Sequence, residues 1–436
     1  MSSTGEQRQL GFWMCTALVI GNTIGMGIFV LPASLAPFGL NAMLGWGVTV
    51  VGMTVLARVF AQLAREFPSA DGPYTYIERT TGRLPAYIAI WSYWVSCWIT
   101  NAALAIGLVG YLAKVVPELD AVSPAVLATV LLWLFVGINL LGVRTGGSVQ
   151  IVTTVLKLLP LLFILGLGAW LLLTEPAVYT RRVPATPITL EALMAASTIA
   201  LFAMLGIESA AVPAGRVRDP EKNIPRSTLY GTLLMAVIYI GVSAMAILLL
   251  QQDRLAQSSA PFADLLDEFV GDGNGWLLSV FVVISGLGAL NGWTLLVSEL
   301  TASLGRHGFL PATVCSLNSR GAPWVAMALT AVLATGMVLM NYSKSMVDGF
   351  TFLTQVVTAA NLPLYLFCSV ALVVAARNGE RNLPASLRVL GTLGTAYVIF
   401  AFIGLGSEPF IWSLVLGAVG LPLYWLMRGP QVKVPA

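Results

Sequence analysis

The sequence has few charged residues for its length. Only 10% of its 436 residues are Asp, Glu, Lys or Arg, whereas 57% are hydrophobic. Soluble domains carry roughly 25% charged residues, and so few charges cannot cover a water-facing surface of this size. A lipid bilayer solvates apolar surface, so we expect an integral membrane protein.

Histidine and cysteine are also scarce, which excludes several kinds of chemistry. His307 is the only histidine, and the four cysteines are scattered without a CxxC pair. A histidine-based metal site is thereby excluded, and we expect no metal and no cofactor. The lack of a nucleophile–base pair argues against an enzyme, and the lack of a filter-like motif argues against a channel. The net charge of +3 comes without a long basic run, so no nucleic-acid partner is expected.

Long apolar stretches make up most of the chain. A spanning helix needs about 20 mostly apolar residues. The stretches run approximately 11–36, 39–63, 85–112, 124–142, 151–173, 191–213, 228–250, 275–303, 322–342, 347–375, 387–406 and 408–427. The loops between them are too short for a soluble domain. We expect an all-α membrane protein, a single domain over 1–436 with about twelve transmembrane helices. The first stretch is too long for a signal peptide and should remain as a spanning helix.

Lysine and arginine are unevenly distributed between the two sides. If the N-terminus is cytoplasmic, 17 of the 23 lie on that side and five on the other, with Lys157 inside a helix. Cytoplasmic loops of membrane proteins carry such an excess. The bias predicts an integral protein of the plasma membrane, the inner membrane in a bacterium, with both termini cytoplasmic. Acidic residues gather in the loop after the seventh stretch, where solvation explains them at least as well as attraction of cations.

Two expected helices contain helix-breaking sequence near their middles. Three glycines fall within 21–27, and each weakens a helix by up to about 1 kcal/mol relative to alanine. A further glycine falls within 205–209. Interrupted helices five helices apart match the inverted-repeat plan of secondary transporters. The repeats would be 11–173 and 191–375, with helices 1 and 6 discontinuous, and 387–427 would add two further helices. Close helix packing is the alternative explanation of the glycines.

An interrupted helix exposes backbone groups that can bind a solute. Freed amides and the positive end of a half-helix suit a carboxylate, whereas freed carbonyls suit an ammonium. In hydrocarbon each unmet group costs several kcal/mol, so such backbone persists only where it lines a cavity. The two breaks together predict a receptor for the head group of an amino acid.

Two ionisable residues lie deep in apolar stretches. Glu208 falls at the second break and Lys157 within the fifth stretch. An ionisable residue at a helix centre costs at least roughly 2.5–3.5 kcal/mol, so both are candidates for ion coupling. The alternative for Lys157 is snorkelling to the cytoplasmic interface, and for Glu208 a neutral structural carboxyl. Trp293 lies in the middle of its stretch, where an interfacial belt does not explain it.

At these positions the sequence resembles the amino acid–polyamine–organocation superfamily, most closely its antiporters of basic amino acids and polyamines, such as arginine and agmatine. The resemblance covers nearly the whole chain. It is carried by Gly21-Asn22 with Gly25-x-Gly27, Ser96-Cys97-Trp98-Ile99 with Asn101, Gly206-Ile207-Glu208-Ser209, Asp219-Pro220-Glu221-Lys222-Asn223-Ile224-Pro225 and Gly292-Trp293. It implies the five-plus-five inverted repeat of the LeuT type and alternating access.

The resemblance also implies a site. The implied substrate-binding residues are Asn22, Thr23, Gly25, Met26, Gly27, Ser96, Cys97, Asn101, Phe202, Leu205, Glu208 and Trp293. Amides at 25–27 would hold the carboxylate, and carbonyls near Thr23, Phe202 and Leu205 would accept from the α-ammonium. Trp293 would stack on the cationic end of the substrate.

Gating and coupling roles are implied in the same way. Phe202 would be the aromatic gate on the extracellular side. Glu208 would couple protonation to the cycle, and Tyr74 would lie near a cytoplasmic gate or pH-sensing region. A lysine at 157 resembles branches in which the ammonium replaces a bound sodium ion, which suggests sodium independence and proton coupling.

Two residues depart from the antiporter pattern. Met26 stands where the pattern has a serine, which removes a hydroxyl from the carboxylate site. Phe202 stands where it has a tryptophan, which leaves a weaker surface for a cation. We therefore expect an antiporter or proton-coupled carrier of cationic amino acids or their amines. A proton-coupled carrier of neutral or broad-range amino acids is the alternative. By resemblance the protein would be a homodimer.

Overall fold

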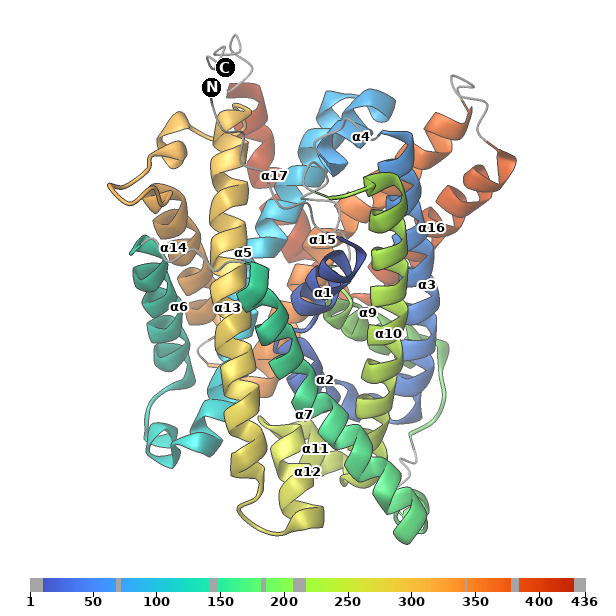
Figure 1. The fold of residues 1–436 in the computed structure, drawn as a ribbon, viewed down its shortest axis with the longest axis vertical. Coiled ribbons are helices and arrows are strands. Elements are labelled where there is room, and N and C mark those ends of the chain that lie inside the picture. Colours follow the sequence, from blue (N-terminus) through green and yellow to red (C-terminus); the bar gives the residue numbers. More distant parts are fainter. Residues whose placement is uncertain are drawn as a thin grey trace.

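The structure is a computed structural model that describes residues 11–67, 72–141, 147–181, 186–206, 217–341, 343–377 and 384–426. Helices packed side by side form the whole of this part, which contains no strand (Figure 1). Eight helices are long and apolar enough to cross a membrane. They are α3 (Leu40–Glu66), α5 (Arg83–Val115), α7 (Gly147–Thr174), α10 (Pro220–Leu249), α13 (Gly275–Arg306), α15 (Met346–Arg377), α16 (Ala385–Gly404) and α17 (Ser407–Leu426).

Shorter apolar helices complete the bundle. They are α1 (Phe12–Thr23), α2 (Gly27–Leu35), α6 (Pro124–Leu140), α9 (Leu190–Ala203) and α14 (Trp324–Met340). Each apolar stretch identified in the sequence overlaps one of these helices or, for 11–36, the pair α1 and α2. Of the stretch 191–213, α9 covers 191–203, and 207–213 lie outside the described residues. The predicted all-helical membrane architecture is thus confirmed, because hydropathy and length alone specify where such helices run.

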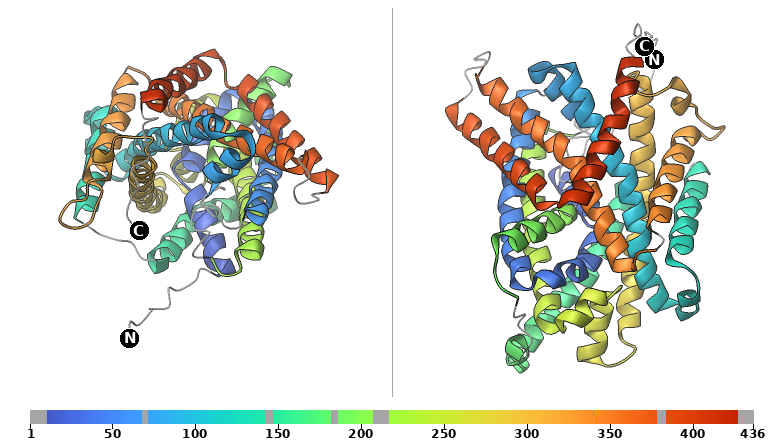
Figure 2. Two further views of the ribbon diagram at one scale, coloured as in Figure 1. Left: turned by 90° about the horizontal axis from the view of Figure 1, so that it is seen from above. Right: turned by 180° about the vertical axis from the view of Figure 1, so that it is seen from behind.

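Helix α5 is the central element of the bundle. In the most apolar 18-residue segment of α5, 94% is buried inside the protein, whereas in the corresponding segment of α17 only 17% is buried. Helices α13 and α15 pack along α5, and α16 and α17 lie at the periphery (Figure 2). The outer side chains of α16 and α17 are apolar, for example the exposed Ile403 and Leu414. Hydrocarbon is the solvent that suits such a surface.

Short helices close the two ends of the bundle. Helix α4 (Pro73–Thr81) lies at the upper end of Figure 1, and α11 (Gln252–Gln257) and α12 (Pro261–Val270) lie at the lower end. The remaining short elements are η1 (Ala36–Phe38), η2 (Pro117–Ala121), α8 (Val178–Arg181) and η5 (Ala312–Cys315). The site described below lies between these two ends.

The acidic loop after the seventh stretch is folded rather than simply solvated. Asp264 accepts from the Lys114 ammonium at 2.8 Å. Asp267 accepts from the amide of Gly275 at 2.8 Å, at the start of α13. A carboxylate there also complements the positive end of the helix. Three of the acidic residues therefore hold the lower end together, since Glu268 likewise pairs with Arg254.

Candidate substrate site

The first predicted helix is broken where its glycines lie. Helix α1 ends at Thr23, α2 begins at Gly27, and residues 24–26 connect them without helical structure. In the described part of the chain, the amides of residues 25–27 find no backbone acceptor. They lie at the N-terminus of α2, where the helix has no acceptors to offer and its dipole favours an anion. The geometry can therefore receive a carboxylate.

The end of α1 is held by side chains from two other helices. The Lys157 ammonium on α7 donates to the carbonyl oxygen of Gly21 at 2.8 Å. The Tyr239 hydroxyl on α10 donates to the carbonyl oxygen of Thr23 at 3.1 Å. Lys157 is only 4% exposed, so it does not extend to the membrane surface. A carbonyl oxygen has two lone pairs, so Thr23 retains one for a ligand.

The structure describes only the first part of the sixth predicted helix, which is α9. The helix stops at Ala203, and residues 204–206 form a turn in which Gly206 has a φ of 102°. Only glycine adopts that conformation without strain. The amide of Leu205 donates to the carbonyl of Phe202 at 3.2 Å, so part of the helix end is already satisfied. Glu208 lies outside the described residues.

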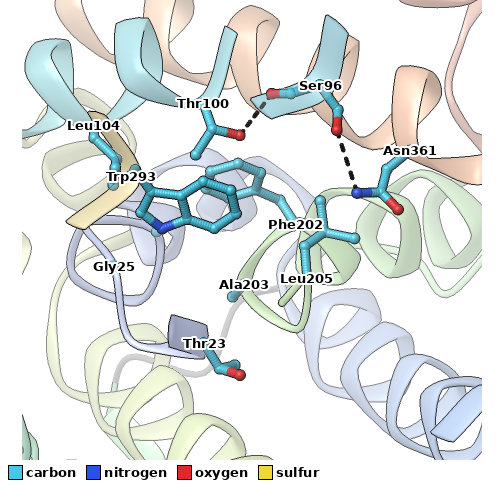
Figure 3. Close-up of a pocket in the computed structure, with 11 residues that line it drawn as sticks. Thr23, Gly25, Ser96, Thr100, Leu104, Phe202, Ala203, Leu205, Trp293 and Asn361 are labelled. Carbon is cyan, nitrogen blue, oxygen red and sulfur yellow. Dashed lines mark hydrogen bonds between the residues drawn. The ribbon is translucent and has the colours of Figure 1, made fainter. Parts of the chain in front are cut away.

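A small cavity lies where the break after α1 and the end of α9 meet α5, α13 and α15 (Figure 3). It is lined by Thr23, Gly25, Gly27, Ser96, Thr100, Leu104, Phe202, Ala203, Leu205, Trp293 and Asn361. The indole of Trp293 lies across it. The free volume is about 20 Å³, which is room for about one water molecule. In this conformation the cavity is filled by its own side chains, and a solute would have to displace Trp293.

The cavity brings together seven of the residues that the sequence singled out. These are Thr23, Gly25, Gly27, Ser96, Phe202, Leu205 and Trp293. Backbone breaks and an intramembrane tryptophan were the signals that identified most of them. Their convergence follows from the bundle, because α1, α2, α5, α9 and α13 approach one another at this level.

Three expected residues lie outside the lining, and two cannot be placed. Met26 is fully buried and does not line the cavity, and its side chain packs beside Gly107 of α5 and Gly286 of α13. Cys97 and Asn101 are buried on other faces of α5. The side chain of Asn22, like Glu208, lies outside the description. Met26 therefore fills a packing gap and does not replace a hydroxyl in the cavity.

Four lining residues were missed by the sequence analysis. Thr100 and Leu104 follow Ser96 at helical spacing on α5, so the pattern i, i+4, i+8 would have identified them. Ala203 simply follows Phe202. Asn361 lies on α15 with its amide nitrogen 3.4 Å from the Ser96 hydroxyl. It is 3% exposed, and its carbonyl oxygen has no donor among the residues that the structure describes.

Aromatic rings close the cavity on one side. Phe202 packs edge-on against Phe350 of α15, with ring centroids 6.1 Å apart. The start of α2 fits closely against Phe202, because a Cβ at Gly27 would lie 2.9 Å from its ring. Glycine is thus required here for the close approach of α2 and α9. The predicted gate residue Phe202 has a partner, Phe350, that the sequence did not suggest.

A larger cavity of about 490 Å³ lies between the first cavity and α4. We call it the vestibule. It is lined by Gly72, Pro73, Tyr74, Thr75, Ile90, Tyr93, Leu296, Glu299, Leu300, Ser303, Leu304, Arg306, His307, Phe309 and Leu364. On three helices a vestibule residue lies about one turn nearer to α4 than a residue of the first cavity. The vestibule residues are Tyr93, Leu296 and Leu364, and the matching residues of the first cavity are Ser96, Trp293 and Asn361. The vestibule is therefore the route that approaches Trp293 from the α4 end.

Tyr74 lies on α4, outside the spanning helices. Its hydroxyl donates to the Glu78 carboxylate at 2.9 Å. Burial and this carboxylate raise the pKa of Tyr74 above its ordinary value. The phenol therefore stays protonated through the physiological range, since the unperturbed value is already about 10. The placement agrees with a residue near a gate, but the phenol itself is not suited to sense neutral pH.

An all-helical membrane bundle with a broken first helix beside a closed cavity has the architecture of a secondary transporter. The comparisons with known proteins agree. The chain belongs to the amino acid permease family, whose model matches residues 10–427. It is 30% identical to the putrescine transporter PotE of Haemophilus influenzae, over 97% of each chain. It is 28% identical to the cadaverine/lysine antiporter of Escherichia coli, over 96% of this chain and 94% of the other.

Proposed function

We propose that the protein exchanges cationic amino acids and their amines across the membrane by alternating access. One observation carries the proposal: Gly25 and Gly27, whose amides have no backbone acceptor among the described residues, line a single cavity together with the Trp293 indole. Amides can hold a carboxylate, and the indole face can hold an alkylammonium or guanidinium by cation–π attraction. The transport names of the two relatives, putrescine and cadaverine/lysine, describe molecules of this class.

We further propose the sidedness of this conformation. Basic residues at the α4 end include Arg65, Arg79, Arg83, Arg306 and Arg377, at the ends of their helices. An excess of lysine and arginine favours the cytoplasmic side. The α4 end and both termini would then be cytoplasmic in a plasma membrane. With Phe202 and Phe350 in contact and the vestibule open, the structure would represent an inward-facing, substrate-free state.

The family plan supports the rest of the architecture. We propose twelve spanning segments, with α1–α2 and α9 as the broken first and sixth segments of a five-plus-five inverted repeat over 11–173 and 191–375. Helices α16 and α17 lie outside the repeat, and their apolar outer faces would provide the contact of a homodimer. These features support the same transport cycle, in which one repeat moves relative to the other.

Coupling is proposed to involve two ionisable groups. Lys157 places a positive charge against α1 that a sodium ion would otherwise supply, so exchange should not require sodium. Glu208, next to the second break in the sequence, would bind and release the coupled proton. A cationic substrate nearby favours its ionised form, so substrate binding and proton release would be linked.

A carrier of neutral amino acids is the second candidate. In the part of the cavity that the structure describes, no lining side chain is charged. Leu104 and Leu205 suit an aliphatic side chain at least as well as a cationic one. The two candidates predict the same head-group contacts and differ only in the end of the substrate that faces Trp293.

Exchange in reconstituted vesicles tests the proposal. Vesicles loaded with lysine, cadaverine, putrescine or leucine would be assayed for uptake of the same labelled compounds, with and without a proton gradient. We expect uptake only into vesicles loaded with a cationic compound. Trp293→Leu should reduce exchange of cations by about tenfold or more, since a desolvated cation–π contact contributes about 2 kcal/mol. Exchange of leucine but not lysine would establish the neutral carrier instead.

A further inference from the structure

Two charged residues of the vestibule lie on one face of α13. Glu299 and Arg306 are seven residues apart and both line the vestibule. Positions i and i+7 fall on the same side of a helix, separated by about 10 Å along the axis at 1.5 Å per residue. Glu299 lies nearer to Trp293, and Arg306 lies at the end of the helix. The vestibule is therefore negative at its inner end and positive at its mouth.

Neither charge is neutralised by a neighbour. Across the described parts of the chain, no cation lies within ion-pair distance of Glu299 and no carboxylate within that distance of Arg306. Glu299 lies two turns from the end of α13 and is exposed, so its carboxylate is available to a cation that enters the vestibule.

The walls between the two charges are apolar or already satisfied. The phenol of Tyr74 bonds Glu78, and the imidazole Nδ1 of His307 lies 2.8 Å from the carbonyl oxygen of Ser303. His307 also stacks on Phe309 at an interplanar angle of 14°. Rings and aliphatic groups make up most of the lining. Among the described lining residues, Glu299 is the only carboxylate and Arg306 the only guanidinium.

We propose that the vestibule holds a second binding site, one for a cationic amino acid. The cationic end of its side chain would bind Glu299, and its carboxylate would bind Arg306. The volume of about 490 Å³ is in the range of small-molecule sites. The substrate class rests on the proposed function, whereas the charge pattern does not. An amine without the carboxylate would make only the Glu299 contact.

The orientation of the bound molecule suits transfer to the central cavity. Residues 293 and 299 are less than two turns apart on α13, so the cationic end held at Glu299 points towards Trp293. Arg306 would retain the carboxylate at the mouth until the cation moves inward. The site would thus select amino acid over amine on the α4 side, before the Trp293 cavity is reached.

Lysine and cadaverine provide a matched pair of probes, because they differ only by the carboxylate. A reporter thiol is introduced by Ser303→Cys, and its modification by a cationic methanethiosulfonate is timed in the purified full-length protein. The parent supplies the background rate, which comes from the partly exposed Cys315, since Cys15, Cys97 and Cys368 are buried. The Trp293→Leu substitution is added to disable the central cavity, so protection then reports the vestibule alone. Thermal unfolding checks that each variant is folded.

Protection of the thiol should depend on the two charges differently. Glu299→Gln should raise the half-protecting concentration of both lysine and cadaverine about tenfold, the loss expected for a charged hydrogen bond. Arg306→Gln should raise the half-protecting concentration of lysine by a similar factor and leave that of cadaverine unchanged. Arg320→Gln, at a basic residue outside the vestibule, is the control and should change neither. Without Glu299 the thiol should also lose its preference for cationic over anionic reagents.

Three results would overturn the second site. They are protection that disappears with Trp293→Leu alone, protection that survives Glu299→Gln, and an equal effect of Arg306→Gln on lysine and cadaverine. In each case, vesicle exchange could still establish the transport function. Conversely, charge-dependent protection without any vesicle exchange would leave the site standing and refute the proposed function.

Discussion

The ammonium nitrogen of Lys157 lies 2.8 Å from the carbonyl oxygen of Gly21, two residues before α1 ends. This contact ties the broken helix to α7 at the level of the cavity. A helix end buried in a membrane needs donors for its last carbonyls. The lysine supplies one of them and places a positive charge against the segment that must move during alternating access.

Replacement of this lysine should affect both stability and turnover. In Lys157→Met the stem remains but the Gly21 carbonyl loses its donor, which should cost about 1–3 kcal/mol. Exchange should slow about tenfold. Initial rates in vesicles and thermal unfolding measure the two effects. Lys114→Met is the control, because its half-exposed pair with Asp264 contributes about 0–1 kcal/mol. Wild-type turnover in Lys157→Met, or strict sodium dependence of the wild type, would contradict the assigned role.

The contact between α2 and α9 gives a steric prediction. A methyl group at Gly27 would lie 2.9 Å from the Phe202 ring, so Gly27→Ala should hold the gate apart. Overpacking of this kind costs about 1–3 kcal/mol. We expect exchange to fall about tenfold and to recover partly when Phe202→Leu is added. Gly47→Ala on α3, where a methyl group would meet nothing within 4 Å, should leave exchange unchanged. Failure of the second change to restore any activity would argue against this contact as the gate.

Asn361 should determine affinity in the central cavity. Its buried carbonyl oxygen has no donor in the described part of the chain, so an ammonium or amide hydrogen of the substrate is the expected partner. Asn361→Ala should weaken binding about tenfold, because hydrogen bonds to charged groups contribute about 1.5–3 kcal/mol. Calorimetric titration with lysine measures this. The matched change Asn341→Ala removes an amide that bonds only within its own helix end, and it should leave affinity unaltered. Equal losses in both variants would indicate a structural effect instead.

Tyr74 should not set the pH dependence of transport. Because its pKa is raised, the neutral phenol is the form present both below and throughout the physiological range. Tyr74→Phe keeps the ring and removes the hydroxyl that bonds Glu78. Exchange measured from about pH 5 to pH 8 should keep the midpoint of the wild type, with at most a few-fold change in rate. A displaced midpoint in the phenylalanine variant would show that the hydroxyl participates in proton coupling.

The helices were predictable from sequence because the bilayer imposes a simple rule. Backbone groups must be satisfied inside each segment, so every long apolar stretch becomes a helix. The break in the first helix was predictable for a similar reason. Glycines at 25 and 27 remove helical preference, and α1 ends and α2 begins beside them. Gly206 lies in the turn after α9. Residues near those breaks, such as Thr23 and Leu205, therefore line the cavity as expected.

The direction of individual side chains was decided by the tertiary structure. Met26 lies in the broken segment, yet it packs against α13 because a gap at Gly286 accommodates its sulfur. Asn361 lies far along the chain from the breaks, and only the packing of α15 against α5 brings it to Ser96. The vestibule likewise has no local signature, because its walls come from α4, α5, α13 and α15. Local sequence thus determined where helices form and break. The direction in which each side chain points depended on which distant helices pack against its own helix.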